Sequence, residues 1–240
     1  MSATTEVVKQ RDFFRLLYYQ RRFAGPVLET VFADPDGCFA NAQSEQTLKH
    51  DRTTTLVKIG GNEKNWVAKR YNTKNAWHAV RRCFTRSRAI NCWEMSFALR
   101  AAGLQTPDPV AMIEQRFGAL RRRSFYFYEY LAGTPVEKII NPGASQQQLD
   151  DMCSAFTGMF GKLAAARIAH GDMKFTNLLW VDNEIALLDL DAAAIYPAAR
   201  YVHAYHKDRD RFLRNWEHLP EFRAQIAAAI PEHPSSMPAA

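Results

Sequence analysis

Apolar and polar residues alternate in the first half of the chain, a pattern that predicts β-strands. Residues 54–59 alternate in this way and end at Gly60-Gly61-Asn62, a stretch typical of a hairpin turn. Residues 65–71 then supply a return strand of similar length. The pattern therefore predicts an antiparallel hairpin in this part of the chain.

A second pair of strands is predicted nearer the middle of the chain. Residues 110–117 are mainly apolar, and residues 124–131 form an aromatic run. A turn over residues 118–123 separates them. Together with the first hairpin, these strands predict an antiparallel sheet.

One amphipathic helix is predicted between the two pairs of strands. Gly103 is a suitable C-cap for residues 87–102, where apolar side chains recur at helical spacing: Ile90, Trp93, Phe97 and Ala101. Glu94 lies on the same predicted face. A carboxylate on an apolar face needs a partner, so we expect Glu94 to be paired.

The second half of the chain is predicted to be mostly helical. Ser145 and Gln148 form a capping box at the start of a helix that should run to about residue 168. A polar stretch follows at residues 170–177. Two short apolar runs come next, separated by an Asp-Asn turn, at residues 178–181 and 185–188.

The end of the chain is short, because only 49 residues follow Asp191. Two more helices are predicted in it, at residues 208–216 and 221–229, and a disordered tail at residues 231–240. The whole pattern predicts an α+β fold in a single two-lobed domain. We expect a sheet with one helix over about residues 25–131, and a small, mostly helical lobe over about residues 132–230.

Composition and charge narrow the class of protein only slightly. The chain has 47% hydrophobic and 23% charged residues, which is ordinary for a soluble globular protein. No apolar run approaches the roughly 18–20 residues that span a bilayer, and the charged Glu6 and Lys9 argue against a secretory signal. We therefore expect a cytoplasmic protein without a transmembrane segment. The net charge of +6 favours partners that carry phosphate or carboxylate, but the arginines are not interleaved with aromatic residues as in nucleic-acid-binding proteins.

The polar stretch at residues 170–177, H-G-D-M-K-F-T-N, carries the candidate catalytic residues. Phosphoryl transfer needs a group that orients the attacking hydroxyl, a metal held against the phosphates, and positive charge near the transferred group. Asp172 can orient the hydroxyl, and Lys174 can neutralise the phosphate. Asn177, five residues after Asp172, can reach magnesium from the same side, and Asp189 can bridge the metal to the phosphates.

The context of this stretch favours catalysis over a polar surface loop with a helix cap. An H-G-D triplet alone occurs by chance. Here a predicted helix precedes it, the asparagine stands at the expected offset, and Leu187-Leu188-Asp189 follows after a hairpin-length gap. The sequence therefore predicts an ATP-dependent phosphotransferase that acts on an alcohol group, with ATP and magnesium as cofactors.

Lys69 is the candidate for holding the nucleotide phosphates. It follows two apolar residues in a predicted strand, so it should face the interior and need an anionic partner such as Glu94. A lysine paired with a helix glutamate is the arrangement found in kinases. The alternative is that Lys69 extends to solvent and Glu94 pairs with a nearby arginine such as Arg88.

The nucleotide lid departs from the kinase pattern. Residues 48–55 read L-K-H-D-R-T-T-T, without the glycines that let a backbone approach phosphates closely. Lys49, Arg52 and the threonine hydroxyls are the possible substitutes. The end of the aromatic strand falls where an adenine-binding hinge is expected, so the backbone groups of Glu129 and Leu131 are candidates to pair with the base.

With these motifs in place, the chain resembles the bacterial lipopolysaccharide kinases of the Kdo kinase/WaaP/InaA family, in the protein-kinase-like superfamily. Residues 189–191, D-L-D, resemble the D-F-D of that family, and residues 67–72, V-A-K-R-Y-N, resemble its K-R-Y strand. Residues 88–94 resemble the following helix, and residues 207–216 its short basic C-terminal helix. The resemblance covers about residues 45–217 and implies a two-lobed protein-kinase-like fold.

The resemblance also implies a substrate and a location. It adds Asp191 to the metal ligands Asn177 and Asp189, and it makes a sugar hydroxyl of the lipopolysaccharide inner core, on heptose or Kdo, the acceptor. The enzyme would then work in the cytoplasm, in peripheral contact with the inner membrane. Several basic residues are compatible with an anionic glycolipid and equally with solvated faces: Arg81, Arg82, Arg121, Arg122, Arg123, Lys207, Arg209, Arg211 and Arg214.

Other functions remain open on the sequence. A typical protein kinase needs an activation segment, an A-P-E motif and a large helical subdomain, for which the 49 residues after Asp191 leave no room. Small-molecule kinases of the aminoglycoside or choline type usually have a longer helical lobe. A nucleotide-binding pseudokinase with a stress or signalling role is the non-enzymatic alternative.

Overall fold

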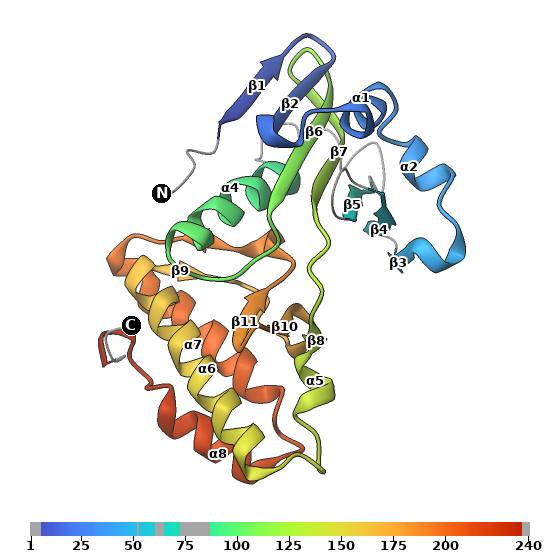
Figure 1. Cartoon of the computed structure of the whole chain (residues 1–240). Coiled ribbons are helices and arrows are strands. Elements are labelled where there is room, and N and C mark those ends of the chain that lie inside the picture. Colours follow the sequence, from blue (N-terminus) through green and yellow to red (C-terminus); the bar gives the residue numbers. More distant parts are fainter. Residues whose placement is uncertain (1–5, 52, 61–64, 73–86, 237–240) are drawn as a thin grey trace. The chain divides into compact units, whose positions relative to one another are not determined.

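The computed structural model describes residues 6–51, 53–60, 65–72 and 87–236, and the chain forms two compact units (Figure 1). The first unit consists of Met1–Glu94 and Pro107–Leu131, and the second of Met95–Thr106 and Ala132–Ala240. Each unit has its own β-structure and its own buried apolar residues.

The first unit is built on a seven-stranded antiparallel sheet with the order β1-β2-β6-β7-β5-β4-β3. Its strands are β1 Val7–Arg11, β2 Arg15–Gln20, β3 Thr47–His50, β4 Thr54–Ile59, β5 Trp66–Tyr71, β6 Pro109–Phe117 and β7 Leu120–Glu129. The strands predicted at residues 54–59, 65–71 and 110–117 are confirmed to within one residue. The predicted hairpin turn at Gly60-Gly61-Asn62 lies mostly outside the described residues.

The predicted turn over residues 118–123 is wrong. Phe117 pairs directly with Leu120, so the hairpin turn contains only Gly118 and Ala119. Gly118 has φ +60°, a left-handed conformation that glycine adopts without strain and that suits a two-residue hairpin. The strand β7 therefore begins four residues earlier than predicted and includes Arg121, Arg122 and Arg123.

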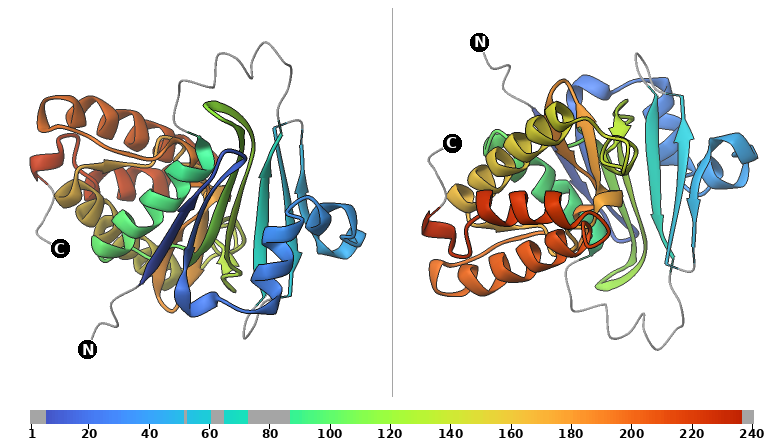
Figure 2. Two further views of the ribbon diagram at one scale, coloured as in Figure 1. Left: turned by 90° about the horizontal axis from the view of Figure 1, so that it is seen from above. Right: turned by 90° about the horizontal axis from the view of Figure 1, so that it is seen from below.

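The segment before β3 covers one face of this sheet. The helices α1 Pro26–Ala33 and α2 Gly37–Ala40 follow β2 and a short 3-10 turn, Arg21–Phe23, and a second turn, Ser44–Gln46, leads into β3. Leu28 and Val31 of α1 are buried in the core of the unit, with Phe23 and the strand residues Leu17, Val57, Trp66, Ala68, Val110, Ala111, Ile113, Phe125 and Phe127. The two further views in Figure 2 show α1 and α2 beside these strands.

The alternation along β5 sends neighbouring residues to opposite faces of the sheet. Trp66 and Ala68 belong to the core under α1, and Arg70 forms an ion pair with Asp36 at 3.1 Å and lies 4.7 Å from the ring centroid of Phe39. Lys69 and Tyr71 face the other way, and the Tyr71 hydroxyl lies 3.2 Å from Sγ of Cys92 in α4. The K-R-Y strand thus joins the sheet to a helix on each face.

The helix predicted over residues 87–102 is α4, Arg88–Ala101. Its buried positions are Ala89, Ile90, Cys92, Trp93, Met95, Ser96 and Leu99. Of the predicted apolar face, Ile90 and Trp93 are buried, Phe97 is half-buried and Ala101 is exposed, and Glu94 is exposed as well. The expectation that Glu94 shares the buried face is therefore wrong, because the buried stripe runs through residues 89, 92, 96 and 99.

The second unit is mostly helical. The long helix α6, Gln146–Ala166, begins at the predicted capping box, in which Ser145 N–H donates to Gln148 Oε1 at 2.9 Å and Gln148 N–H donates to Ser145 Oγ at 3.3 Å. Its other helices are α5 Val136–Ile139, α7 Ala198–Arg214 and α8 Pro220–Ala229. Two small sheets complete the unit: β8 Thr134–Pro135 with β10 Leu178–Val181 and β11 Glu184–Leu187, and β9 Ile168–Ala169 with β12 Ala194–Ile195.

Aromatic side chains fill the core between α6, α7 and α8. The Phe212 ring centroid lies 4.8 Å from that of Phe156 and 5.2 Å from that of Phe160, and the Trp216 centroid lies 5.6 Å from that of Phe222. The helix predicted at residues 221–229 is confirmed by α8. The one predicted at residues 208–216 starts ten residues too late, and Pro234–Ser236 of the expected disordered tail form a 3-10 turn.

Candidate active site

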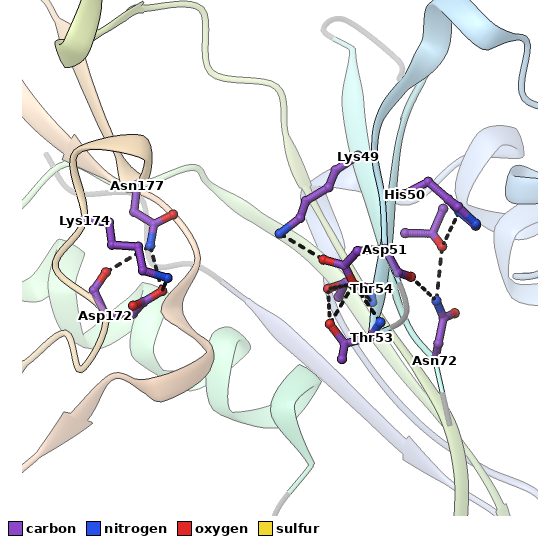
Figure 3. Close-up of polar contacts among 10 residues, drawn as sticks. Lys49, His50, Asp51, Thr53, Thr54, Asn72, Asp172, Lys174 and Asn177 are labelled. Carbon is purple, nitrogen blue, oxygen red and sulfur yellow. Dashed lines mark hydrogen bonds and ion pairs between the residues drawn. The ribbon is translucent and has the colours of Figure 1, made fainter. Parts of the chain in front are cut away.

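The stretch H-G-D-M-K-F-T-N forms a tight loop between β9 and β10 (Figure 3). Lys174 Nζ donates to Asp172 Oδ2 at 3.0 Å, and Asn177 Nδ2 donates to the same oxygen at 3.3 Å. Asn177 Nδ2 also donates to the backbone oxygen of Asp172 at 3.0 Å, which fixes the width of the loop. The loop therefore brings together all three residues predicted as catalytic.

The hairpin of β10 and β11 returns the chain to this loop just before Asp189. Leu188 N–H donates to the Asn177 carbonyl at 2.9 Å, and the Leu188 carbonyl lies 2.8 Å from His170 Nε2. Beyond the D-L-D segment, β12 pairs with β9, the strand that leads into His170. Contacts with the loop on both sides therefore hold Asp189 and Asp191 beside it.

Asp189 has an unusual backbone conformation. Its φ of +57° and ψ of +65° lie in the left-handed region, where Asp, Asn and Gly are the residues most often found. It forms the N-cap of a 3-10 turn, Leu190–Ala192, in which Asp191 is half-buried. Left-handed residues other than glycine concentrate at functional sites, where the surrounding structure enforces them.

Gly171 allows the loop to contact the segment after Asp189. Its φ is +77°, and a Cβ at this position would lie 2.6 Å from the carbonyl oxygen of Ala192. A heavy atom cannot occupy that distance without moving the backbone. Glycine is therefore required here both for its conformation and for the close approach.

His170 is buried and its hydrogen bonds define its tautomer. Nε2 faces the Leu188 carbonyl, which can only accept, so Nε2 carries the proton. Nδ1 accepts a hydrogen bond from Asp172 N–H at 3.3 Å. The imidazole thus connects the backbone of Asp172 to the residue that follows β11.

Three residues of α7 and the turn after it support the loop, and the sequence reasoning missed them. Asp208 is buried and accepts hydrogen bonds from His170 N–H at 2.5 Å and Gly171 N–H at 2.9 Å. Arg211 forms an ion pair with Asp172 Oδ1. Asn215, the C-cap of the helix, donates from Nδ2 to the Met173 carbonyl at 3.2 Å.

These three residues follow the helical period, since their spacings are three and four. The helix therefore contacts the loop residue by residue along one stripe. Burial raises the pKa of the Asp208 carboxyl above its ordinary value, although His170, the two backbone N–H groups and Arg211 act in the opposite direction. The helical spacing of these polar residues could have been recognised in the sequence. It was overlooked because the segment was interpreted as a short basic helix with a solvated face.

The predicted lid of the first unit is a hairpin turn closed by Asp51 (Figure 3). Asp51 Oδ1 accepts from Thr53 N–H at 2.6 Å, Thr54 N–H at 2.7 Å and the Thr53 hydroxyl at 2.7 Å, and Lys49 Nζ lies 3.1 Å from Oδ2. The Thr53 hydroxyl and the backbone donors lower the pKa of Asp51 below its ordinary value. The Asp51 carboxylate thus holds, by hydrogen bonds, the turn that a glycine-rich sequence forms in protein kinases. Arg52, the other predicted cation of the lid, lies outside the described residues.

The remaining predicted nucleotide residues also belong to the first unit. Lys69 is buried, and its Nζ lies 5.1 Å from the ring centroid of Tyr71, which also lies 4.8 Å from the Arg88 guanidinium. Glu129 donates its N–H to the Asp108 carbonyl at 2.9 Å, so a contact from Glu129 to a base would use its carbonyl. Leu131 is the last residue of this part of the unit.

The residues predicted as metal ligands fit magnesium shared with a nucleotide. Magnesium takes hard oxygen ligands and usually binds through one or two carboxylates together with substrate phosphates. Asp189 and Asp191 supply carboxylates, and the amide nitrogen of Asn177 faces Asp172, so its oxygen is the atom left for a metal. Within the described parts of the chain no cluster of three or more His, Cys, Asp or Glu could hold a metal by itself.

A sheet unit with a buried lysine, and a helical unit with an H-G-D-x-K-x-x-N loop beside a D-L-D segment, define a phosphotransferase of the protein-kinase-like class. The family model described as "Lipopolysaccharide kinase (Kdo/WaaP) family" matches residues 41–228, which is most of the chain. The chain therefore belongs to the Kdo/WaaP lipopolysaccharide kinase family. It is an ATP-dependent kinase, and the resemblance inferred from the motifs is confirmed.

The solved structure of WaaP has the same fold. WaaP, determined in complex with acyl carrier protein, is 16% identical and gives a TM-score of 0.61, with 88% of this chain and 89% of that chain covered. A mutant form of the PknI kinase domain of Mycobacterium tuberculosis is 13% identical with a TM-score of 0.49, covering 79% of this chain and 87% of that chain. None of the curated proteins matches the sequence. In the described residues no helix is long and apolar enough to cross a membrane.

Proposed function

We propose that this kinase transfers phosphate from ATP to a sugar hydroxyl of the lipopolysaccharide inner core, on heptose or Kdo. The observation that carries the proposal is the family match over residues 41–228, which includes the whole catalytic loop and the D-L-D segment. The geometry of the loop is consistent with transfer to an alcohol, because it presents a carboxylate next to a partly exposed cation.

Asp172 acts as the group that orients the acceptor hydroxyl. Arg211 holds Oδ1, while Lys174 and Asn177 share Oδ2. The Lys174 side chain is about half exposed, so it can turn from Asp172 towards the transferred phosphate. That movement leaves a lone pair on Oδ2 for the hydroxyl proton, and the ion pair with Arg211 holds the carboxylate in place.

Asn177, Asp189 and Asp191 would hold magnesium, which neutralises phosphate charge when it is bound. In the first unit, Lys69 would contact the α- and β-phosphates with Glu94 as its partner, and Lys49 would assist as part of the lid. The backbone groups of Glu129 and Leu131 would pair with the adenine. These five assignments in the first unit rest on the sequence motifs.

The proposed acceptor also implies a location for the enzyme. The lipid-linked core is held in a membrane, so we propose that the protein works in the cytoplasm in peripheral contact with the inner membrane. Basic residues support a contact with anionic lipids. Four of the basic residues considered for this contact have partners within the protein. Arg211 binds Asp172, and Arg209 donates to the carbonyls of Ile230 and Ala227 at the end of α8. Arg121 pairs with Glu114 and Arg123 with Asp36.

The test is transfer of phosphate to purified inner-core oligosaccharide from a strain in which the gene is deleted. The wild type with magnesium and ATP should add one phosphate, detected by mass spectrometry, and fragmentation should identify the sugar. Asp172→Asn should lower the rate by about 10²–10⁴, the usual contribution of a general base. Asp189→Asn should lower the affinity for magnesium, so that more magnesium is needed for half-maximal activity. The protein should stay folded, because asparagine also adopts the left-handed conformation.

Asp182→Asn is the matched control. Asp182 is exposed in the turn between β10 and β11 and also has a positive φ, but it lies outside the catalytic loop and the D-L-D segment. Its rate should equal that of the wild type. Two results together would contradict the kinase assignment and favour a pseudokinase. The deletion strain would have an unchanged core phosphate content, and the wild-type protein would bind ATP without transferring its phosphate to the acceptor.

A further inference from the structure

Four large apolar side chains are exposed at one end of the sheet in the first unit. Phe13 is 55% exposed, Phe14 65%, Phe117 58% and Leu120 51%. They come from the turn between β1 and β2 and from the turn between β6 and β7, which Figure 1 shows at the same end of the sheet. We call these four residues the aromatic tip. Exposed apolar clusters of this kind mark sites of interaction.

The side chains and turns of the aromatic tip are held together by ring packing and hydrogen bonds. Ring centroids of Phe13 and Phe117 lie 5.0 Å apart in an edge-to-face arrangement, and those of Phe13 and Phe14 lie 5.2 Å apart. The two turns are hydrogen-bonded to each other, because Gly118 N–H donates to the Phe13 carbonyl at 2.9 Å and Arg116 N–H donates to the Phe14 carbonyl at 2.6 Å. A Cβ on Gly118 would lie 3.2 Å from the Phe13 ring, so a larger residue at this position would displace the ring.

The charge around the aromatic tip is strongly positive. Residues 9–15 and 114–123 contain seven cationic side chains and two anionic ones, a formal charge of +5 within a chain whose net charge is +6. One of the seven, Arg123, pairs with Asp36 outside these stretches, which leaves +4. Both anions are already engaged. Asp12 accepts from Phe14 N–H and Arg15 N–H, and the fully buried Glu114 pairs with Arg116 at 2.6 Å and Arg121 at 3.4 Å.

The cations that remain on the surface flank the apolar residues. Arg11 and Arg122 are exposed, one on the strand beside each turn. Aromatic and leucine side chains enter the boundary between lipid headgroups and acyl chains, while arginines beside them bind lipid phosphates. This combination fits an anionic bilayer. The apolar side chains of the tip match the boundary of the acyl chains, and the exposed arginines match the negative surface charge.

We propose that the aromatic tip is a membrane-docking surface that inserts into the interface of an anionic phospholipid bilayer. The proposal deepens the membrane contact described above and rests on that part of the proposed function. It names the residues that make the contact. The test uses vesicles without any glycolipid, so its outcome does not depend on which sugar is phosphorylated.

The experiment is co-sedimentation of the full chain with vesicles of phosphatidylcholine alone or mixed with phosphatidylglycerol. The wild type should bind the mixed vesicles at low salt, bind neutral vesicles far more weakly, and lose affinity as salt is raised. The double substitution Phe13→Ser/Phe117→Ser should lower the affinity at least tenfold. Arg122→Glu, which leaves the apolar residues in place, should also lower it and should reduce the salt dependence.

Ile195→Ser is the matched control, because Ile195 is 59% exposed but belongs to β12 of the second unit. It should bind vesicles as the wild type does. Thermal unfolding of each variant checks that the fold is retained. The tip variants should phosphorylate soluble core oligosaccharide at the wild-type rate, so a failure of docking and a failure of the kinase assignment give different results.

Two outcomes would overturn the proposal. One is a wild type that does not bind anionic vesicles at low salt, or tip variants that bind them equally well. The other is self-association of the wild type, abolished by the same substitutions, without vesicle binding. That result would assign the aromatic tip to contact with a second copy of the chain.

Discussion

At Gly171 the catalytic loop passes against the segment that follows Asp189. The carbonyl oxygen of Ala192 occupies the space where a side chain would begin, and the backbone is left-handed. On either side of Gly171, His170 and Asp172 are fixed by their own hydrogen bonds. The residue therefore has no direction in which it can move without displacing Asp172 or the D-L-D segment.

Gly171→Ala should consequently damage both stability and catalysis. We expect a loss of about 1–3 kcal/mol in the free energy of unfolding, from the strained φ and the contact with Ala192. The rate should fall about 10²-fold or more, because a shift near 1 Å in a catalytic group has that effect. Denaturant unfolding and the phosphate-transfer assay measure the two effects.

Gly158→Ala is the corresponding control. Gly158 lies in α6, where an added Cβ would meet nothing within 4 Å. Alanine is the better helix former, so this variant should gain about 0.5–1 kcal/mol in stability and keep its activity. Equal effects of the two substitutions would show that the close approach at Gly171 has no special role.

At the residue scale, the sequence predicted those candidate site residues whose spacing is set inside one loop. Asp172, Lys174 and Asn177 meet because a tight turn brings positions five apart together. Asp208 and Arg211 are 36 or more positions beyond Asp172 along the chain, and only the packing of α7 brings them to the loop. No local spacing contains that information.

At the element scale, α7 is a helix whose buried stripe is partly polar. Besides Ala204, Phe212 and Leu213, its buried residues are Tyr201, Tyr205, Asp208 and Arg209. A search for apolar periodicity recognises only its second half, which explains why the predicted helix began at residue 208. The polar members of the stripe are the ones that hold the catalytic loop and the end of α8.

Asp208 gives this helix a dependence on pH. Burial raises the pKa of its carboxyl above the ordinary value of 3.8, so the folded protein keeps a proton that the unfolded chain has released. The stability from this group is present below the ordinary value and is lost as the pH rises through the raised folded-state value. Asp208→Asn removes the titration, so the free energy of unfolding should decrease less over that pH window.

The same variant should slow catalysis. An asparagine presents an N–H group to one of the two backbone donors of the loop, and an unsatisfied buried donor costs about 1–3 kcal/mol. Asp210→Asn, on an exposed position of the same helix, is the control and should change neither the pH profile nor the rate. Urea unfolding at a series of pH values, from below 3.8 upward, makes the comparison. Parallel pH profiles for all three proteins would argue against this role of Asp208.

The strands β1 and β2 escaped prediction for opposite physical reasons. The edge strand β1 is mostly exposed, so it lacks apolar alternation. In β2, the consecutive residues Leu16, Leu17, Tyr18 and Tyr19 are all buried or half-buried, because α1 packs with one face of the sheet and α4 with the other. Strands covered on both faces have continuous apolar runs. In contrast, β4 was recognised by its alternation, and β5 as the return strand after a glycine turn.

At the scale of the whole molecule, each unit contains a separate core. Phe212 is fully buried in the second unit, and Phe127 is fully buried in the core of the first. Removing either ring creates a cavity that should cost about 3–5 kcal/mol. We expect Phe212→Ala to reduce hydrogen-exchange protection first in residues 132–230, and Phe127→Ala to reduce it first in the seven-stranded sheet. Uniform loss of protection in both variants would mean that the two units unfold together.

Composition predicted the sign of the charge of the molecule but not where that charge is placed. The net +6 is ordinary for a kinase that binds phosphates. In the fold, Arg70 and Arg123 hold Asp36, and Arg209 binds carbonyls of α8, so these arginines serve structure. Exposed cations flank the aromatic tip, which became visible only when two turns about 100 residues apart were found beside each other.

The pairing of β2 with β6 also sets an order of events during synthesis. The ribosome completes β2 about 100 residues before it completes β6, which at 5–20 residues per second is a delay of roughly 5–20 s. Until then the amino-terminal hairpin has no partner strand, and Phe13 and Phe14 are exposed on a nascent chain. Chains arrested before β6 should therefore be cleaved by protease within residues 7–20, and chains arrested well after β7 should resist. The β1–β2 hairpin is thus made well before the strand that secures it in the sheet.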